Sequence, residues 1–326
     1  MELALNVSYI TLDGFFQVNK YRYLYFMIMF TVYILILCCN FTIIFLIVVE
    51  KSLHEPMYIF IAALLLNSVM LSTVIYPKLL IDFLSKRQIV SYSVCLFQFF
   101  MFYSLGGSEF LLLFAMAYDR YVSICKPLQY PIIMTKNTIS IFLTLAWIVP
   151  SSQVAVAAVL IANKKICNFT FTGIFCNNTI YKLLCLHSKA QTVYDMVVLF
   201  NVAILPAVFI FFTYTRILVI SYQSCKEVRR KAAQTCLPHL IVLISYLCLC
   251  AFDIIISGLE SNFPKIVHSI LTLQIVMYPP LFNPIIYGLK MKEISNHLKR
   301  LRVKQSQNAA ITKVKKTSFT GDGKGK

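Results

Sequence analysis

Seven long apolar stretches separated by short polar segments dominate the hydropathy pattern of this chain of 326 residues. Each stretch is continuous and long enough to cross a bilayer as an α-helix, which takes about 20 residues. A membrane β-barrel would instead show segments of about ten residues with alternating polarity. The pattern therefore predicts an all-α membrane protein with a bundle of seven transmembrane helices. The seven predicted spans are residues 24–49, 57–81, 94–121, 138–162, 193–220, 237–258 and 266–288.

The chain divides into a transmembrane domain, a segment before it and two segments after it. Residues 1–23 form a short N-terminal segment, in which we expect no cleavable signal peptide, and residues 24–288 form the transmembrane domain. Within 289–303, apolar Ile294 and Leu298 alternate with basic Lys299 and Arg300, which predicts a short amphipathic helix on an anionic membrane surface. Residues 304–326 are rich in Lys, Ser, Thr and Gly and predict a disordered basic tail.

The composition supports a membrane protein and excludes two other classes. The chain is 59% hydrophobic and only 13% charged, with more apolar surface than a soluble domain can bury. A formal net charge of +17 would suggest nucleic-acid binding in a soluble protein. Here the basic residues lie between apolar runs and in the tail, so we expect membrane lipid and no nucleic acid as a partner. The sequence shows no arrangement of nucleophile, metal ligands or phosphate loop, so we expect no enzyme and no metal site.

The distribution of basic residues predicts the orientation in the plasma membrane. Twenty of the 30 Lys and Arg residues lie on the side of the membrane that holds the C-terminal tail. By the positive-inside rule, the C-terminus is cytoplasmic and the N-terminus is extracellular.

Cysteines and glycosylation sequons agree with this orientation. Four cysteines fall on the oxidising outer side, namely Cys95, Cys167, Cys176 and Cys185. Four cysteines allow three pairings, and their spacing does not decide between them. Acceptor sequons at Asn6, Asn168 and Asn177 lie on the same side. Asn40 also matches the sequon inside the first span, so the pattern alone does not establish modification.

The residues that narrow the class follow the third span. Residues 116–125 read MAYDRYVSIC and closely resemble the signature of odorant receptors, which are rhodopsin-like G-protein-coupled receptors. Further blocks that resemble this family are residues 53–58 (LHEPMY), 213–214, 231–232, 235–236, 239–240 and 280–287 (PLFNPIIY). The resemblance implies a receptor that binds a small-molecule odorant and activates a heterotrimeric, cAMP-raising G protein. Arrestin and a receptor kinase are further partners that it implies.

The chain departs from the family pattern at three positions. Asn67 lies where an acidic residue is usual in the second helix, and Cys39 replaces a common glycine. In the sixth helix, Leu247 occupies the usual tyrosine position, and Tyr246 lies one residue earlier.

The family resemblance also implies a switch at the cytoplasmic end. Asp119 would hold Arg120 in the resting state and release it to the G protein when the sixth helix moves outward. The alternative is an ordinary ion pair at the membrane interface. Pro284 interrupts the helical hydrogen bonds of the last span, which would let Tyr287 move. The complete predicted set is Asp119, Arg120, Tyr121, Tyr214, Lys231, Asn283, Pro284 and Tyr287.

By the same resemblance, the odorant site lies in the outer half of the bundle, under a lid formed by the loop after the fourth span. The candidate residues are Phe102, Tyr103, Gly106, Gly107, Val198, Val202, Asp253 and Ile256. The paired glycines would leave room beside an aromatic wall, although aromatic residues at helical spacing also serve plain packing. A carboxylate at Asp253 would favour ligands that carry an amine. The family pattern further implies the pairs Cys95–Cys176 and Cys167–Cys185.

Glu109 is a carboxylate in the middle of a predicted span and therefore a functional candidate. The family pattern implies a sodium pocket formed by Glu109 and the residue at position 67, but Asn67 removes one of the two negative charges. The alternative is that Glu109 connects the second and third helices by hydrogen bonds. Two other functions stay open: a chemosensory receptor used outside olfaction, and an ion transporter, which the lack of an inverted repeat disfavours.

Overall fold

The computed structural model describes residues 9–15, 18–186, 188–222, 236–237, 239–251, 265–290 and 294–296, and most of them are helical. The long helices are α1 (Val18–Val49), α2 (Pro56–Leu84), α3 (Tyr92–Cys125), α5 (Lys136–Ala162), α6 (Lys189–Leu199), α7 (Leu205–Tyr222) and α9 (Lys265–Lys290). A π-helical turn, η4 (Phe200–Ile204), joins α6 to α7. Shorter helical elements are η1 (Lys51–Leu53), η2 (Pro127–Gln129), α4 (Tyr130–Ile133) and η3 (Asn178–Leu183).

Five helices within the described residues are long and apolar enough to cross a membrane. They are Lys20–Val49, Pro56–Leu84, Tyr92–Cys125, Lys136–Ala162 and Lys189–Tyr222, and they contain the first five predicted spans. The sixth predicted span is described only in part, as the apolar helix His239–Ala251. The seventh is the continuous helix α9, which contains three prolines.

Local sequence explains where several helices begin. Proline is at the first position of α2, where its missing N–H costs no helical hydrogen bond. The Ser91 hydroxyl accepts a hydrogen bond from the backbone N–H of Val94 at the start of α3, and Thr135 does the same for Thr138 at the start of α5. Such side-chain caps satisfy N–H groups that the first helical turn leaves without partners.

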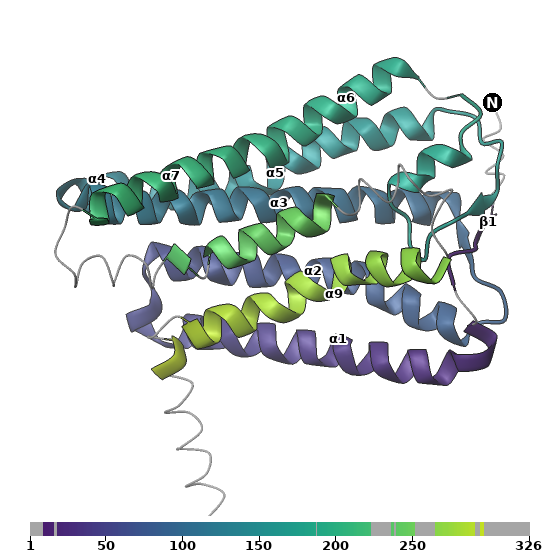
Figure 1. The fold of residues 1–326 in the computed structure, drawn as a ribbon, viewed down its shortest axis with the longest axis horizontal. Coiled ribbons are helices and arrows are strands. Elements are labelled where there is room, and N and C mark those ends of the chain that lie inside the picture. The colour runs from purple at the N-terminus through teal and green to yellow at the C-terminus, as the bar shows by residue number, and fades with distance from the viewer. Residues whose placement is uncertain are drawn as a thin grey trace, which may run out of the picture.

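The long helix α3 lies in the middle of the bundle. It packs against α2, α5 and α7, while α1 packs against α2 and α9 (Figure 1). Its buried face therefore contacts helices from both halves of the chain. At about 1.5 Å per residue, its 34 residues span about 50 Å, so one rigid element reaches from one end of the bundle to the other.

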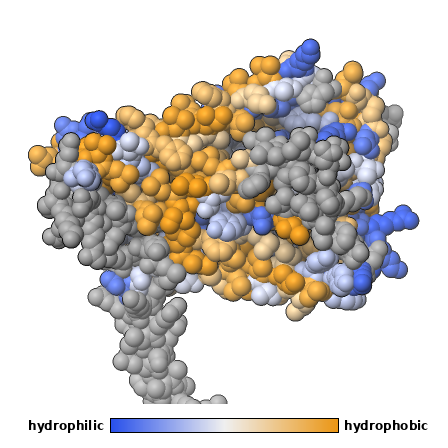
Figure 2. Space-filling model, viewed as in Figure 1, coloured by the Kyte–Doolittle hydropathy of each residue, from blue (hydrophilic) through white to orange (hydrophobic). Residues whose placement is uncertain are grey.

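The outer faces of the helices are apolar. Large hydrophobic side chains such as Phe45, Ile81, Val193 and Phe212 are more than half exposed. Figure 2 shows hydrophobic residues over most of the visible side of the helices, with hydrophilic residues mainly towards the two ends. Exposed apolar surface of this extent is typical of helices that face lipid.

A small sheet at one end of the bundle was not expected from the all-α prediction. The strand β1 (Tyr9–Leu12) lies between β2 (Ile89–Ser91), to which it is antiparallel, and β3 (Thr170–Phe171), to which it is parallel. Ile10 and Leu12 alternate with exposed residues and are buried. Strands this short carry little signal of their own, and their pairing depends on three segments far apart in sequence.

Two disulfides lie at the same end as the sheet. Cys95, at the start of α3, bonds to Cys176, and Cys167 bonds to Cys185, which is the pairing implied by the family resemblance. We call this the disulfide end, and the opposite end, where α3 finishes, the Arg120 end. Of the predicted amphipathic helix 289–303, the described residues after α9 are 294–296, which are helical with Ile294 buried. The tail 304–326 lies outside the described residues.

Candidate functional site

The Arg120 end contains a three-residue hydrogen-bonded cluster. The Arg120 guanidinium donates from Nε and Nη2 to Oδ2 of Asp119, at 2.9 and 2.6 Å. The Tyr130 hydroxyl donates to the other carboxylate oxygen of Asp119 at 2.8 Å. Asp119 is completely buried, so both of its oxygens need these partners. The cluster holds Arg120 against Asp119 and holds Asp119 against the connection between α3 and α5.

Tyr130 belongs to this site although no sequence motif marks it. It begins the short helix α4, and burial together with the neighbouring Asp119 carboxylate raises its pKa, so the hydroxyl remains a donor. Its only signal in the sequence is a tyrosine in a proline-containing segment shortly after Arg120. The fold of that connection is needed to bring the two residues together.

Two predicted tyrosines, Tyr214 and Tyr287, and the motif residue His239 are buried near this cluster. Tyr214 on α7 is 2% exposed, and its hydroxyl has no hydrogen-bond partner among the described residues. Tyr287 on α9 is buried and lies 3.3 Å from Nδ1 of His239, on the helix His239–Ala251. Tyr121 is half-buried, and Lys231 lies outside the described residues. The tyrosines from two helices are thus buried in the same core cluster.

Proline in α9 explains a link between the first and last helices. Because Pro284 has no N–H, it leaves the carbonyl of Pro280 without its helical partner. The Asn40 side chain donates to that carbonyl at 2.8 Å. One turn away, Asn283 donates from Nδ2 to Glu109 at 3.0 Å. Helix α9 is therefore joined to α1 and α3 by hydrogen bonds from the side-chain amides of Asn40 and Asn283.

Asn67 and Glu109 make their hydrogen bonds in different places. Asn67 donates to the carbonyl of Leu105 at 2.9 Å and accepts from the Trp147 indole at 3.2 Å. Asn67 therefore connects α2 with α3 and α5, whereas Glu109 connects α3 with α9. A link from Glu109 to the second helix, one of the two expectations, is not among its hydrogen bonds in the described part of the chain.

A small cavity of about 10 Å³ adjoins Glu109. Its polar lining includes Glu109, Asn283, Ser245 and Tyr246, and one oxygen of the Glu109 carboxyl has no partner in the described structure. A cavity of this size holds about one water molecule. The space beside Glu109 is therefore much smaller than a pocket for an odorant.

At the disulfide end, the loop after α5 inserts into the bundle above α3. Phe102 packs against Phe175 with ring centroids 5.1 Å apart, and the Tyr103 hydroxyl accepts a hydrogen bond from the backbone N–H of Asn178 at 2.9 Å. Ile174 and Phe175 are buried in the same hydrophobic cluster as Phe102. The predicted pocket residues Phe102 and Tyr103 thus contact the loop, which covers this part of the bundle.

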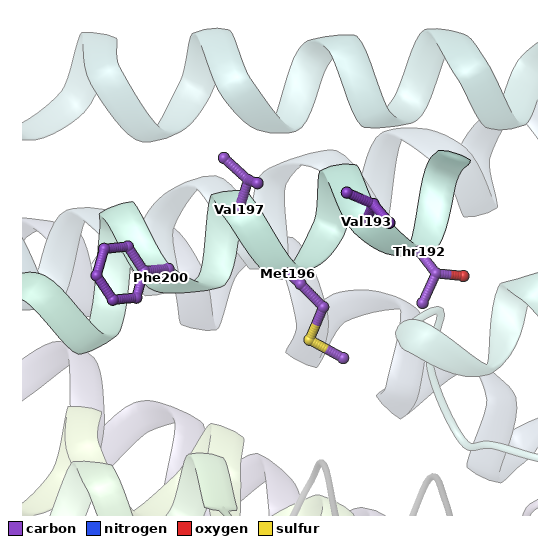
Figure 3. Close-up of a pocket in the computed structure, with 5 residues that line it drawn as sticks. All are labelled: Thr192, Val193, Met196, Val197 and Phe200. Atoms are coloured by element: carbon purple, nitrogen blue, oxygen red, sulfur yellow. The ribbon is translucent and has the colours of Figure 1, made fainter. Parts of the chain in front are cut away.

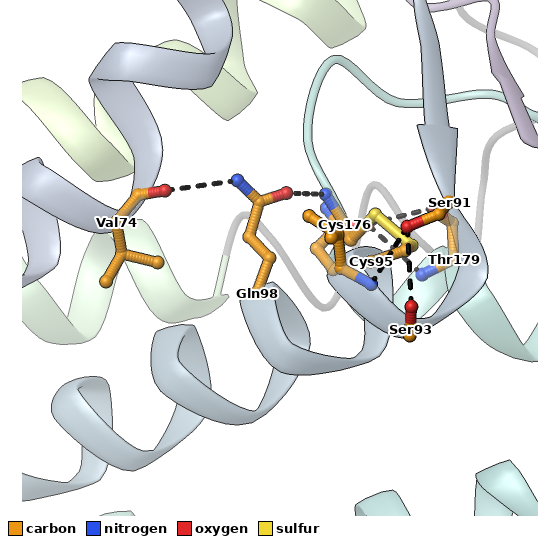
Figure 4. The surroundings of a disulfide bond; sticks show 9 residues. Val74, Ser91, Ser93, Cys95, Gln98, Cys176 and Thr179 are labelled. Carbon is orange, nitrogen blue, oxygen red and sulfur yellow. Dashed lines mark hydrogen bonds between the residues drawn. A yellow bond between two sulfur atoms is a disulfide. The ribbon is translucent and has the colours of Figure 1, made fainter.

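Gln98 anchors that loop beside the disulfide and was also missed from the sequence. Its Oε1 accepts from the backbone N–H of Cys176 at 2.9 Å, and its Nε2 donates to the carbonyl of Val74 on α2 at 3.4 Å (Figure 4). Gln98 is buried, so both ends of its side chain are used within the protein. A single amide therefore connects α2, α3 and the loop.

The paired glycines do not leave the open space expected of them. A Cβ atom at Gly107 would collide with Val202 and Pro150, so this glycine permits close packing of α3 against α5 and η4. At Gly106 the adjacent space holds the hydroxyl of Tyr246, which donates to the Gly106 carbonyl at 3.0 Å. Tyr246 thus faces α3 although it is one residue away from the usual family position.

Of the other predicted ligand residues, Val202 is buried and Val198 is half-buried, while Asp253 and Ile256 lie outside the described residues. A separate apolar hollow of about 320 Å³ lies along α6 and the start of η4. Figure 3 shows its lining residues on this one helical segment: Thr192, Val193, Met196, Val197 and Phe200. Among the predicted ligand residues that the structure describes, none lines this hollow.

Comparison with known proteins agrees with the resemblance seen in the motifs. The family model for olfactory receptors matches residues 29–305. The human protein named olfactory receptor 11A1 is 31% identical over 306 residues, which are 92% of this chain and 96% of that protein. Olfactory receptor 6B9 from Mus musculus is 33% identical over 310 residues, which are 92% and 95% of the two chains. With its membrane-type helices and nearly full-length similarity, the chain belongs to the olfactory receptor family.

Proposed function

We propose that this chain is a plasma-membrane odorant receptor with seven spans, an extracellular N-terminus and a cytoplasmic C-terminus. A small-molecule odorant binds in the outer half of the bundle and favours a state that activates a heterotrimeric, cAMP-raising G protein. The observation that carries the proposal is the cluster in which Asp119 binds both Arg120 and Tyr130 at one end of α3. Olfactory receptors are not enzymes, and neither is this chain.

The two ends of α3 support the proposed orientation. Disulfides form in an oxidising environment, and this supports an extracellular position for the end that holds Cys95–Cys176. The opposite end of the same helix then lies at the cytoplasm, with Asp119 and Arg120 beside the place where a G protein would bind. The excess of basic residues on that side agrees with this assignment.

The buried hydrogen bonds suggest how the switch works. In the resting state Asp119 satisfies two donors of Arg120, and the buried hydroxyl of Tyr214 has no partner within the described part of the chain. An unsatisfied buried hydroxyl costs about 1–3 kcal/mol, so Tyr214 gains a partner if Arg120 leaves Asp119. Outward movement of the helix His239–Ala251 would also separate His239 from Tyr287. An odorant can shift this equilibrium only by binding the active state more tightly.

Further partners would act on the cytoplasmic side. A receptor kinase would phosphorylate hydroxyl groups of the tail, which lies outside the described residues, and arrestin would bind the phosphorylated tail. Membrane lipid surrounds the apolar faces of the helices.

A reporter assay tests this function directly. Cells that express the receptor and a cAMP reporter are screened with water-soluble amines, amino acids and carboxylic acids, and any active compound is tested again on Arg120→Ala. We expect the variant to reach the cell surface and to lose the response by at least about tenfold, which corresponds to about 1.4 kcal/mol. A full response in Arg120→Ala at equal surface expression would contradict the proposed route to the G protein.

A further inference from the structure

Two sequons of the same type lie in the loop between α5 and α6, and they differ in their exposure to solvent. Asn168 belongs to Asn-Phe-Thr with Thr170, and Asn177 belongs to Asn-Asn-Thr with Thr179. Both occur in the same disulfide-bonded loop and both place threonine two residues after asparagine. Sequence alone therefore gives them equal weight as sites of N-glycosylation.

The side chain of Asn168 is presented to solvent on a fixed backbone. The backbone N–H groups of Cys167 and Asn168 both donate to the carbonyl of Leu183, at 2.8 and 3.1 Å. The Asn168 Oδ1 accepts from the backbone N–H of Thr170 at 3.0 Å, and both residues of the sequon are exposed. The asparagine and the threonine that a transferase must read are thus accessible together.

Asn177 has the opposite environment. It is 1% exposed, and Thr179 is 2% exposed. Its Oδ1 accepts from the backbone N–H and from the hydroxyl of Thr179, at 3.1 and 2.9 Å, which caps the helix η3. The preceding residue, Cys176, is fully buried in its disulfide. An oligosaccharide on Asn177 could not be accommodated unless this cap opened and the residue left the core.

We propose that Asn168 carries an N-linked oligosaccharide in the folded protein and that Asn177 does not. This rests on the extracellular placement of the loop in the proposed function. In the reaction, the Asn168 Nδ2 attacks the anomeric carbon of an oligosaccharide linked to a lipid pyrophosphate. The new C–N bond replaces the C–O bond to the pyrophosphate, which leaves with the lipid, and a base of the transferase takes one amide proton.

A glycan on Asn168 would lie next to the edge of the small sheet. Asn168 directly precedes Phe169 and the strand β3, which lies at the edge of the small sheet. Exposed edges invite pairing with other chains, and bulky polar groups beside an edge oppose that pairing. A glycan at Asn168 would therefore shield the edge of the sheet at the disulfide end.

Aspartate variants test the proposal with a matched pair. Asn168→Asp and Asn177→Asp each keep the Oδ1 acceptor and remove the amide that would be glycosylated. Both are made in an Asn6→Gln background of the full chain, and surface-biotinylated receptor is compared before and after peptide N-glycosidase. We expect one glycan step in the background, its complete loss in Asn168→Asp and its retention in Asn177→Asp.

A second measurement covers the case in which Asn177→Asp fails to reach the surface. The glycosidase converts a glycosylated asparagine to aspartate, so peptide mapping of the wild-type loop should show aspartate at 168 and asparagine at 177. Conversion at 177, or no conversion at 168 in surface receptor, would overturn the proposal. Surface biotinylation of a tag on the N-terminus, with an untagged control, reports separately whether the proposed orientation holds.

Discussion

The contacts within the disulfide end of the bundle differ in kind from those within the Arg120 end. At the disulfide end, two disulfides, a three-stranded sheet and the buried Gln98 amide join α2, α3 and the loop after α5. At the Arg120 end, the described contacts among Asp119, Arg120, Tyr130, Tyr214 and Tyr287 are side-chain hydrogen bonds and packing. Covalent bonds and backbone pairing resist rearrangement, whereas side-chain hydrogen bonds exchange partners at modest cost. This difference suits a protein that keeps one end fixed and rearranges the other.

Removing a disulfide should produce the largest effect. The Cys95–Cys176 bond closes a segment with a sequence separation of 81 residues, against 18 for Cys167–Cys185. By loop entropy, these bonds are worth about 4.5 and about 3 kcal/mol. We expect the double variant Cys95→Ser with Cys176→Ser to lose surface expression and thermal stability more than the Cys167 and Cys185 pair does. Flow cytometry and a thermal-shift assay in detergent measure both, and exposed Cys38→Ser is the control. Equal losses from the two pairs would argue against a stabilising effect of loop length.

The second largest effect should come from Asp119→Asn, which should raise basal signalling and leave the stability of the receptor nearly unchanged. Asp119→Asn removes the charge that holds Arg120, and a hydrogen bond between charged groups is worth about 1.5–3 kcal/mol. We expect basal cAMP to rise about tenfold at equal surface expression. The control is Asp13→Asn, the same substitution at an exposed acid of the disulfide end, which should leave basal cAMP unchanged. Wild-type basal activity in Asp119→Asn would show that the cluster is only an interfacial ion pair.

Tyr130→Phe should give the smallest effect of the three. It removes one hydrogen bond to Asp119 and leaves the aromatic ring and the Arg120 contact in place. The loss of about 1 kcal/mol corresponds to a rise in basal cAMP of about fivefold. Because both substitutions act on Asp119, the double variant with Asp119→Asn should be no more active than Asp119→Asn alone. The exposed Tyr23→Phe is the matched control, and additive effects of the two substitutions would place Tyr130 outside the cluster.

Individual residues show which parts of the site could be predicted. The motif around Asp119 and Arg120 identified their ion pair, because a charged side chain at the end of a membrane-type helix needs a partner and Asp119 is the nearest acid in sequence. The prediction of open space beside Gly106 and Gly107 was wrong. The side chains that fill this space belong to Tyr246, Val202 and Pro150, which are far away in sequence. Tyr130 and Gln98 were missed for the same reason, since their partners depend on how a loop folds against α3.

The sequence by itself determined the class of protein, the positions of the long apolar helices and the pairs of residues that lie near each other along the chain. These follow from hydrophobicity and helical geometry, which act locally and need no partner. Only the tertiary structure decided that Asn67 binds Trp147, that Asn40 binds the carbonyl left free by Pro284 and that Asn177 is buried while Asn168 is not. Each of these depends on the hydrogen bonds and burial of a side chain among distant segments, and those are settled only when the helices and the loop pack together.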